Sequence, residues 1–329
     1  MKSDQADQKT IRLMKNDQAD QKAISLIKRD QGRLGSMDLK IDIRPLTKAE
    51  DSIKVEELQL LVWPGSETDV VPGHMMLAVA RNGGLVLGAF HKDQLVGFVF
   101  GFLGTDDESP DRPAMAKLKH HSHMMGVHPE YRDKGIGVSL KLAQRNFVSK
   151  QGIRLITWTY DPLQSRNGYV NIHRLGAVCR KYHRKAYGEM RDGLNLGYPS
   201  DRFEVEWWIT SSRVKTRVSG SREALDLANY LGGGAVKINP ASLGSDGVLH
   251  PSEELLPVKD TLILIEIPSN IFELKTRDPQ LAHQWRMHTR ELFEEAFSKS
   301  YIVTDFIYLK GERFPRSYYV LSHGESRLG

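Results

Sequence analysis

The amino-acid sequence predicts an α+β fold, in which a mixed, mostly antiparallel sheet is flanked by helices. Two observations carry this prediction. The apolar segments 85–90 and 95–103 are separated by a short polar stretch, a pattern typical of a β-hairpin. Farther along the chain, the helical pattern of 139–150 lies between two strand patterns, 120–127 and 153–160. The order of elements is thus mixed, and the first sheet is mainly antiparallel.

The remaining elements follow from the same kinds of pattern. Residues 220–257 are rich in glycine and are expected to form a connector with little regular structure. Pro279 is typical of the first position of a helix. In that helix Trp285, Phe293 and Phe297 recur at helical spacing, which predicts core positions. Strands are expected at 39–46, 203–209, 262–267, 301–309 and 317–321, and helices at 51–62, at 166–175 and from 279 onward.

The first 36 residues form a polar repeat. Lys2–Met14 reads KSDQADQKTIRLM, Lys15–Ile27 reads KNDQADQKAISLI, and a decayed third copy starts at Lys28. Such a composition buries little apolar surface, so we exclude the repeat from the fold and take Met37 as an alternative start. Whether the copies are marginal helical segments or a duplicated leader stays open. We expect three parts, namely a tail at 1–36, a first domain at 37–212 and a C-terminal extension at 213–329.

Charge and cysteine content limit the classes of function. The formal net charge is +5, and residues 1–36 supply +3 of it through eight Lys or Arg against five Asp. The rest of the chain is nearly balanced, which argues against a nucleic-acid partner. The single cysteine, Cys179, excludes an internal disulfide framework and favours a reducing compartment. No apolar run approaches the roughly 20 residues of a membrane span. We therefore expect a cytoplasmic protein without a membrane partner.

One segment carries recognisable chemistry. Val127-His128-Pro129-Glu130-Tyr131-Arg132-Asp133-Lys134-Gly135-Ile136-Gly137 links a predicted strand to a predicted helix. A helix N-terminus presents unpaired N–H groups and the positive end of the helix dipole, and glycines let the backbone approach a phosphate. Arg132 and Lys134 add positive charge. A dinucleotide fingerprint would need a third glycine at position 140, which is Leu140, and a P-loop would need Gly-Lys-Ser/Thr, which is absent. The pattern predicts a pyrophosphate cradle of another kind.

A strand that ends in Val, followed by His-Pro-Glu-Tyr-Arg and then Arg-x-x-Gly-x-Gly, resembles motif A of the GNAT acyltransferases. The resemblance covers about 39–209 and implies a GNAT fold with acyl-CoA as the donor. It implies that backbone N–H groups of 133–138 hold the pyrophosphate, and that backbone groups of Met125 and Val127 pair with the pantetheine arm. Cofactor-binding candidates are Met125, Gly126, Val127, Arg132, Asp133, Lys134, Gly135, Ile136, Gly137, Val138 and Asn171.

The resemblance also suggests catalytic candidates. A base often precedes the strand-ending Val by six residues in this family, and that position is His121. Many members supply a Tyr as the acid for the leaving thiolate, but here Ile172 stands in its place. His173 and Tyr187 are then the candidate acids, with Tyr169 and Tyr182 as further substitutes. Tyr187-Gly188-Glu189 resembles a Tyr-containing strand that lines the acceptor site in some members. We assign no metal-binding residue.

Several features resemble a narrower group of long GNAT proteins with a similar C-terminal extension, including Val303–Phe306 and Ser317–Val320. Some of these are assigned as succinyl-CoA:amino acid N-succinyltransferases, which implies acetyl-CoA or succinyl-CoA as donor and a small amine or amino acid as acceptor. Four arginines are candidates for an acceptor carboxylate: Arg166, Arg174, Arg180 and Arg184. The alternatives are a protein N-terminal or lysine acetyltransferase and a non-catalytic CoA-binding protein. The extension resembles a degenerate half-GNAT, expected to cover the first domain or to form a homodimer contact.

Overall fold

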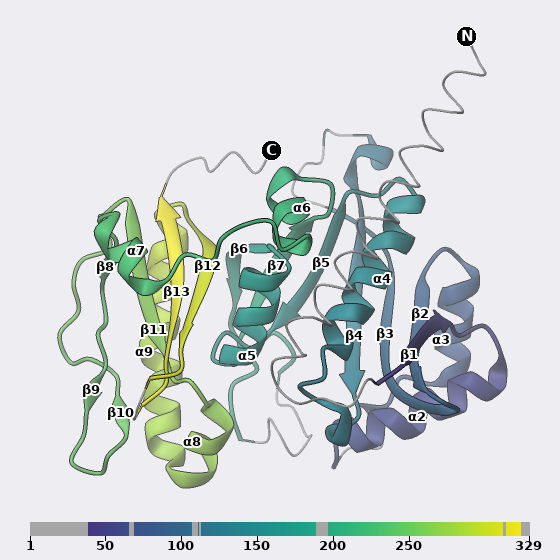
Figure 1. Ribbon diagram of the computed structural model, residues 1–329, viewed down its shortest axis with the longest axis horizontal. Helices are drawn as coiled ribbons and strands as arrows, with labels where there is room; N and C mark the ends of the chain where they lie inside the picture. The colour runs from purple at the N-terminus through teal and green to yellow at the C-terminus, as the bar shows by residue number, and fades with distance from the viewer. Residues whose placement is uncertain are drawn as a thin grey trace. The chain divides into compact units, whose positions relative to one another are not determined.

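The computed structural model describes residues 39–65, 69–106, 111, 113–188, 197–311 and 314–323. The predicted tail at 1–36 and the alternative start at Met37 lie outside these residues. The described chain forms two compact units (Figure 1). The first is built from the chain up to Ile156 together with Lys215–Arg222, and the second from Thr157–Val214 and the chain from Glu223 onward. Whether 37–212 and 213–329 are separate domains in the family sense stays a prediction.

The first unit is an antiparallel sheet with helices on both of its faces. Its strands follow the order β1-β2-β3-β4. Apolar side chains of α2 and α3 pack on one face around Phe98, and those of α4 pack on the other around Val99. The elements are β1 (Ile41–Pro45), α2 (Ala49–Val62), α3 (Gly73–Arg81), β2 (Leu85–His91), β3 (Gln94–Thr105), η2 (Ala114–Lys117), β4 (Leu118–Val127), η3 (Pro129–Tyr131) and α4 (Ile136–Lys150).

Strand β4 contains a bulge, which decides which of its side chains face α4. Phe100 pairs with Met124, and the next residue of β3, Gly101, pairs with Ser122, so His123 is the additional residue on β4. Because side chains alternate along a strand, one additional residue reverses the alternation. His120 and Ser122 therefore lie on the α4 face together with Met125 and Val127. Without the bulge, strict alternation would place the two pairs on opposite faces.

The second unit has the strand order β5-β7-β6-β12-β13-β11-β8. Strand β13 pairs antiparallel with β11 and β12, and β6 pairs antiparallel with β12 and β7, whereas β8 and β11 are parallel. Its elements are α5 (Ser165–Gly168), the π-helix η4 (Tyr169–Arg174), β6 (Val178–His183), β7 (Arg202–Trp208), α7 (Leu227–Gly232), β8 (Val236–Lys237), β9 (Ser242–Leu243), β10 (Leu249–His250), β11 (Leu262–Ile267), α8 (Ile271–Arg277), α9 (Pro279–Ser298), β12 (Tyr301–Leu309) and β13 (Arg316–His323). The chain passes between the units within β5 (Leu155–Tyr160) and α6 (Ser212–Val218).

Helices α9 and α7 cover opposite faces of this sheet. Tyr319 of β13 packs against Phe293 of α9, whereas its neighbours Tyr318 and Val320 pack with Tyr230 of α7. Helix α9 starts as the sequence predicts, because Asp278 accepts a hydrogen bond from the Leu281 N–H at 2.9 Å and Pro279 follows it. The expected core positions Trp285 and Phe293 are fully buried.

The structure confirms the predicted α+β GNAT fold with its mixed sheet and flanking helices, but several details differ. Helices α3 and α8 and strand β6 had no counterpart in the prediction. Helix α4 begins at Ile136 rather than at 139, because the left-handed Gly135 turns the chain directly into it. The expected helix at 166–175 is a short α-helix followed by a π-helix. The connector at 220–257 is more structured than expected, since it contains α7, β8, β9 and β10. Among the described residues, no helix is both long and apolar enough to cross a membrane.

Candidate functional site

The loop between β4 and α4 forms an N–H-lined corner in the first unit. Asp133 has φ +64° and Gly135 has φ +75°, so the chain adopts the left-handed conformation twice just before the helix. That conformation is uncommon for a residue other than glycine, and it often occurs at ligand-binding loops. The Ser139 N–H donates to the carbonyl of the N-cap residue, Gly135, at 3.0 Å. By helix geometry, the N–H groups of the first turn have no partner within the helix.

Two cations of this loop are exposed and tied to its own backbone. Arg132 donates from Nε to the Val127 carbonyl at 3.4 Å, and Lys134 donates from Nζ to the Glu130 carbonyl at 2.8 Å. The ammonium of Lys134 also lies 4.7 Å from the centre of the Tyr131 ring. The hydroxyl of Tyr131 in turn lies 2.9 Å from Nδ1 of His91 in the β2–β3 hairpin. The positive charges are thus held beside the helix N-terminus, where the dipole already favours an anion.

Packing explains Gly126 in this segment, but not Gly137. A Cβ at Gly126 would come within 2.9 Å of the Phe98 ring, so packing alone requires glycine there. Gly137 is the second residue of α4, and a Cβ there would meet only Met125 and Val127, at ordinary contact distances of 3.4 Å and more. The fold itself does not need a glycine at 137. A glycine at a helix N-terminus lets a ligand approach the backbone closely.

The histidines of β4 have different environments. His121 is half-buried, and its ring lies 5.3 Å from that of Phe102 and 6.1 Å from that of His123. His120 is fully buried on the α4 face, where its Nε2 lies 3.1 Å from the side-chain nitrogen of Gln144. Burial, with the charges of Lys141 and His121, lowers the pKa of His120 to about 3. His121 thus remains the candidate base, and His120 is a neutral core residue.

A buried lysine accompanies His120. Lys141 of α4 donates to the Ser122 hydroxyl at 2.7 Å and to the Gln144 side-chain oxygen at 3.3 Å. Its side chain is almost entirely enclosed, and this burial lowers the pKa of Lys141 to about 7. Sequence reasoning missed this cluster, because lysine is expected at the surface.

The remaining site candidates lie in the second unit. Asn171 is buried in the π-helix η4, and π-helical turns are frequent at functional sites. His173 of the same helix stacks on Tyr169 at 4.9 Å, and its Nδ1 lies 3.1 Å from a carboxylate oxygen of Asp305. Asp305 is itself buried and accepts a hydrogen bond from the Tyr230 hydroxyl. One ring nitrogen of His173 is therefore engaged in a structural contact with β12.

Tyr187 lies in a turn after β6 and not in a strand, as its sequence context had suggested. The chain leaves β6 at His183, and the residues up to Gly188 form turns. The phenol is half-exposed, and its hydroxyl lies 2.7 Å from the Thr159 hydroxyl on β5. The guanidinium of Arg202 lies 5.5 Å from the centre of the ring. Tyr187 is thus an accessible phenol in a defined position, as a proton donor needs to be.

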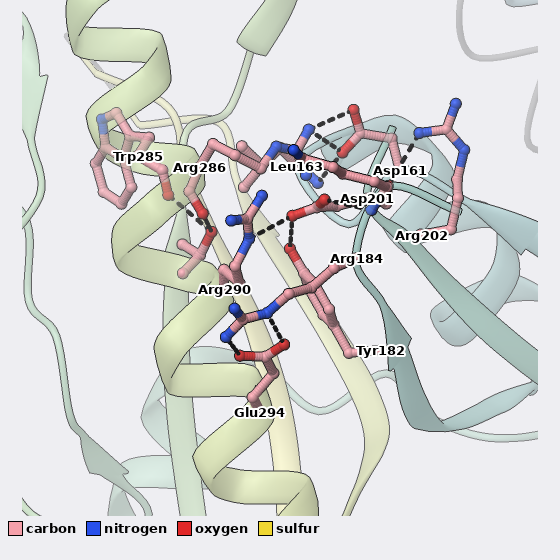
Figure 2. A network of polar contacts seen from close by, with 12 residues as sticks. Asp161, Leu163, Tyr182, Arg184, Asp201, Arg202, Trp285, Arg286, Arg290 and Glu294 are labelled. Atoms are coloured by element: carbon pink, nitrogen blue, oxygen red, sulfur yellow. Dashed lines mark hydrogen bonds and ion pairs between the residues drawn. The ribbon is translucent and has the colours of Figure 1, made fainter. Parts of the chain in front are cut away.

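A network of buried charges reaches this turn through Asp201, which accepts a hydrogen bond from the Lys185 N–H (Figure 2). Arg286 of α9 donates from one nitrogen to both carboxylate oxygens of Asp161, at 2.7 and 2.6 Å. Arg290, one helical turn on, donates from Nε to Asp201 at 2.8 Å. Burial alone would raise the pKa of each carboxyl group, but the positive charge of Arg286 and the hydrogen bonds to each carboxylate outweigh it and hold both pKa values below the ordinary range. The network links α9 to the end of β5 and to the start of β7.

The four arginines expected to bind an acceptor carboxylate are not equivalent. Arg180 pairs with Glu206 at 2.7 Å, and Arg184 pairs with Glu294. Arg166 is exposed and Arg174 is half-buried.

Sequence reasoning missed three other arginines of this region. Arg202 lies against the Tyr187 ring, and Arg286 and Arg290 pair with the buried carboxylates of the network. For the two arginines of α9, the sequence contained one indication. Positions 286, 290 and 294 are four residues apart, which places three charged side chains on one stripe of the helix.

Comparisons with known proteins identify the family of the segment that contains the loop. Residues 53–176 match the family described as acetyltransferase (GNAT) family, a range that includes β4, the loop and α4. Similar solved structures include Arabidopsis thaliana NAA60 in complex with acetyl-CoA, at 16% identity over 51% of this chain and 99% of that chain, with a TM-score of 0.41. Another is the ribosomal-protein-S18-alanine N-acetyltransferase from Escherichia coli, at 12% identity over 53% and 96%, with a TM-score of 0.40.

A further solved structure is Arabidopsis thaliana Naa50 in complex with a bisubstrate analogue, at 16% identity over 50% of this chain and 97% of that chain, with a TM-score of 0.39. At such identities and scores, these likenesses carry nothing about the acceptor. A comparison with curated protein sequences finds no match. The family match falls on the segment that contains the loop, the helix and the glycines described above. Residues 53–176 are therefore an N-acyltransferase domain of the GNAT family.

Proposed function

We propose that this protein transfers an acyl group from CoA to a small primary amine. One observation carries the proposal, namely the corner formed by the end of β4, the left-handed loop and the first turn of α4, with a glycine at 137 that packing does not require. Backbone N–H groups of that turn, aided by Arg132 and Lys134, bind the pyrophosphate of CoA. Met125 and Val127 lie at the adjoining end of β4, where the pantetheine arm binds.

The reaction needs two proton movements. The amine loses a proton as its nitrogen forms a bond to the thioester carbonyl carbon, and the carbon–sulfur bond then breaks with release of the CoA thiolate, which takes up a proton. His121, half-buried on β4, is the candidate base for the amine. Tyr187 is the stronger candidate acid for the thiolate, because its phenol is accessible, whereas His173 is stacked on Tyr169 and joined to Asp305.

The acceptor we infer is a free amino acid. Arg202 lies against the Tyr187 ring, so a cation stands beside the candidate acid, and a guanidinium is the side chain best suited to bind a carboxylate. Arg166, Arg174, Arg180 and Arg184 are further candidates, and the last two of them pair with Glu206 and Glu294. The acyl group is acetyl or succinyl, and titration with the two CoA thioesters decides between them.

The Gly137→Glu variant tests the cradle. The helix dipole stabilises a glutamate in the first turn of a helix, so the free energy of unfolding should not fall. Its charge would stand about 5 Å from a bound phosphate, which costs roughly 3 kcal/mol at an effective dielectric constant of 20, or about 100-fold in affinity. Gly104→Glu is the matched control, because a Cβ there meets only side-chain carbons of Lys119 at 3.9 Å. Equal CoA affinity for the two variants in a calorimetric titration would contradict the proposal.

A further inference from the structure

The turn that carries Tyr187 is bonded to the segment just before β7. Ser200 accepts the Ala186 N–H on its carbonyl at 3.0 Å and the Tyr187 N–H on its hydroxyl at 3.1 Å. The same hydroxyl donates to the Gly188 carbonyl at 2.7 Å. Lys185 has φ +47°, which is an unfavourable conformation for its side chain. A strained turn of this kind persists only where surrounding contacts hold it.

Asp201 joins this turn to helix α9. It is completely buried and accepts hydrogen bonds from three directions: from the Lys185 N–H at 3.0 Å, from the Tyr182 hydroxyl at 2.7 Å and from Nε of Arg290 at 2.8 Å. A buried carboxylate without a cation would be costly, and Arg290 supplies the charge that lets Asp201 remain ionised. Figure 2 shows Tyr182, Arg290 and Asp201 converging.

Arg290 lies in α9, 89 residues after Asp201, and both residues lie outside the segment 53–176 that matches the acetyltransferase (GNAT) family. A second contact from the same helix reaches the turn, because Glu294 pairs with Arg184. Helix α9 thus contacts the turn from one side, while the Thr159 hydroxyl contacts the phenol of Tyr187 at its other end. The position of the phenol therefore depends on the C-terminal extension.

We propose that Asp201 and Arg290 are positioning residues for acyl transfer: this buried ion pair fixes the turn at 184–188 and so places the hydroxyl of Tyr187. The inference rests on the proposed function, in which Tyr187 gives a proton to the CoA thiolate. Both side chains are buried, so neither is assigned a contact with the substrate. Loss of the pair should therefore lower the rate of the chemical step and leave binding of acyl-CoA, whose cradle lies in the first unit, unchanged.

The test compares Asp201→Asn and Arg290→Gln in the full chain with Arg290→Lys and with Glu295→Gln. The last variant is the matched control, because it removes the exposed Glu295–Lys299 ion pair from the same helix. We expect kcat to fall about tenfold or more in the first two variants, since small misplacements of reacting groups are costly, with KM for acyl-CoA within about twofold of the unmodified chain. Arg290→Lys keeps the charge and should restore part of the rate.

Hydrogen exchange at the backbone amides of Lys185, Ala186 and Tyr187 gives a readout that is independent of activity. We expect about tenfold faster exchange there in Asp201→Asn, with exchange of the β12–β13 amides unchanged. Exchange equal to that of Glu295→Gln, or faster exchange with an unchanged kcat, would overturn the proposal. If Asp201→Asn also speeds exchange in β12–β13, the comparison of kcat and of turn exchange between Arg290→Lys and Arg290→Gln tests whether the ion pair holds the turn. An unmodified chain without transfer activity would refute the proposed function, and the exchange measurement would still show whether the pair holds the turn.

Discussion

Replacing Arg286 by Met should strongly destabilise the second unit. The Arg286 and Asp161 side chains are 1% and 3% exposed, and two short hydrogen bonds join them. Removing one partner of such a pair leaves an uncompensated buried charge, which costs about 3–5 kcal/mol. For a unit of this size that corresponds to a fall in the melting temperature of roughly 6–20 °C. The Glu295→Gln control, in an exposed pair on the same helix, should cost about 0–1 kcal/mol.

The effect should depend on pH in a defined direction. In the unmodified chain the pKa of Asp161 is held below its ordinary value, so the pair contributes stability above about pH 4 that is lost as the pH falls through the lower folded-state pKa. In Arg286→Met, Asp161 loses the charge and the hydrogen bonds of Arg286, which are the strongest contributions against burial, so its pKa rises and its folded state takes up a proton more readily. The difference in unfolding free energy between the two chains should therefore shrink as the pH falls from 7 toward 4.

Urea unfolding, followed by tryptophan fluorescence, measures these free energies. The double variant Asp161→Asn with Arg286→Met removes both charges, and it should recover most of the loss, because neutral replacement of a buried pair is often tolerated. An asparagine side chain at this position can still accept the hydrogen bond that the Leu163 N–H now gives to Asp161 at 2.9 Å. A single variant no less stable than Glu295→Gln, or a double variant whose loss equals the sum of the single losses, would refute this account.

Two further predictions concern the first unit and the acceptor. Burial lowers the pKa of Lys141 from 10.5 to about 7. Between these two pH values the folded chain therefore lacks a proton that the unfolded chain still binds. Its unfolding free energy should thus rise with pH in that window by up to about 1.4 kcal/mol per unit, and Lys141→Met should remove this rise; parallel pH profiles of the two chains would count against it. If the acceptor is an amino acid, its decarboxylated amine should show a much lower kcat/KM, and equal values would favour protein N-terminal or polyamine acceptors.

The sequence alone was sufficient to predict the part of the candidate site whose residues are neighbours in the chain. The strand that ends at Val127, the loop cations and the glycines before α4 all lie within about a dozen residues. Their conformation depends on neighbours in sequence, through strand alternation, glycine geometry and the start of a helix. The same local patterns predicted the β2–β3 hairpin and the start of α9 at Pro279. Strand β6 was missed because its pattern, Val-Cys-Arg-Lys-Tyr-His, alternates too weakly to indicate a strand.

Only the tertiary structure decided which charges meet. Asp161 and Arg286 are 125 residues apart, and His173 and Asp305 are 132 apart. Periodicity reports whether a residue faces a core, but it carries no information on the partner that neutralises a buried charge. An arginine or lysine in a helix is expected to be solvated unless a carboxylate or hydroxyl from another element reaches it. The sequence therefore determined the loop at 132–138 that we propose as the anion cradle. The surroundings of Tyr187 were determined by the contacts of α9 with Asp161 and Asp201, because those contacts exist only once distant segments come together.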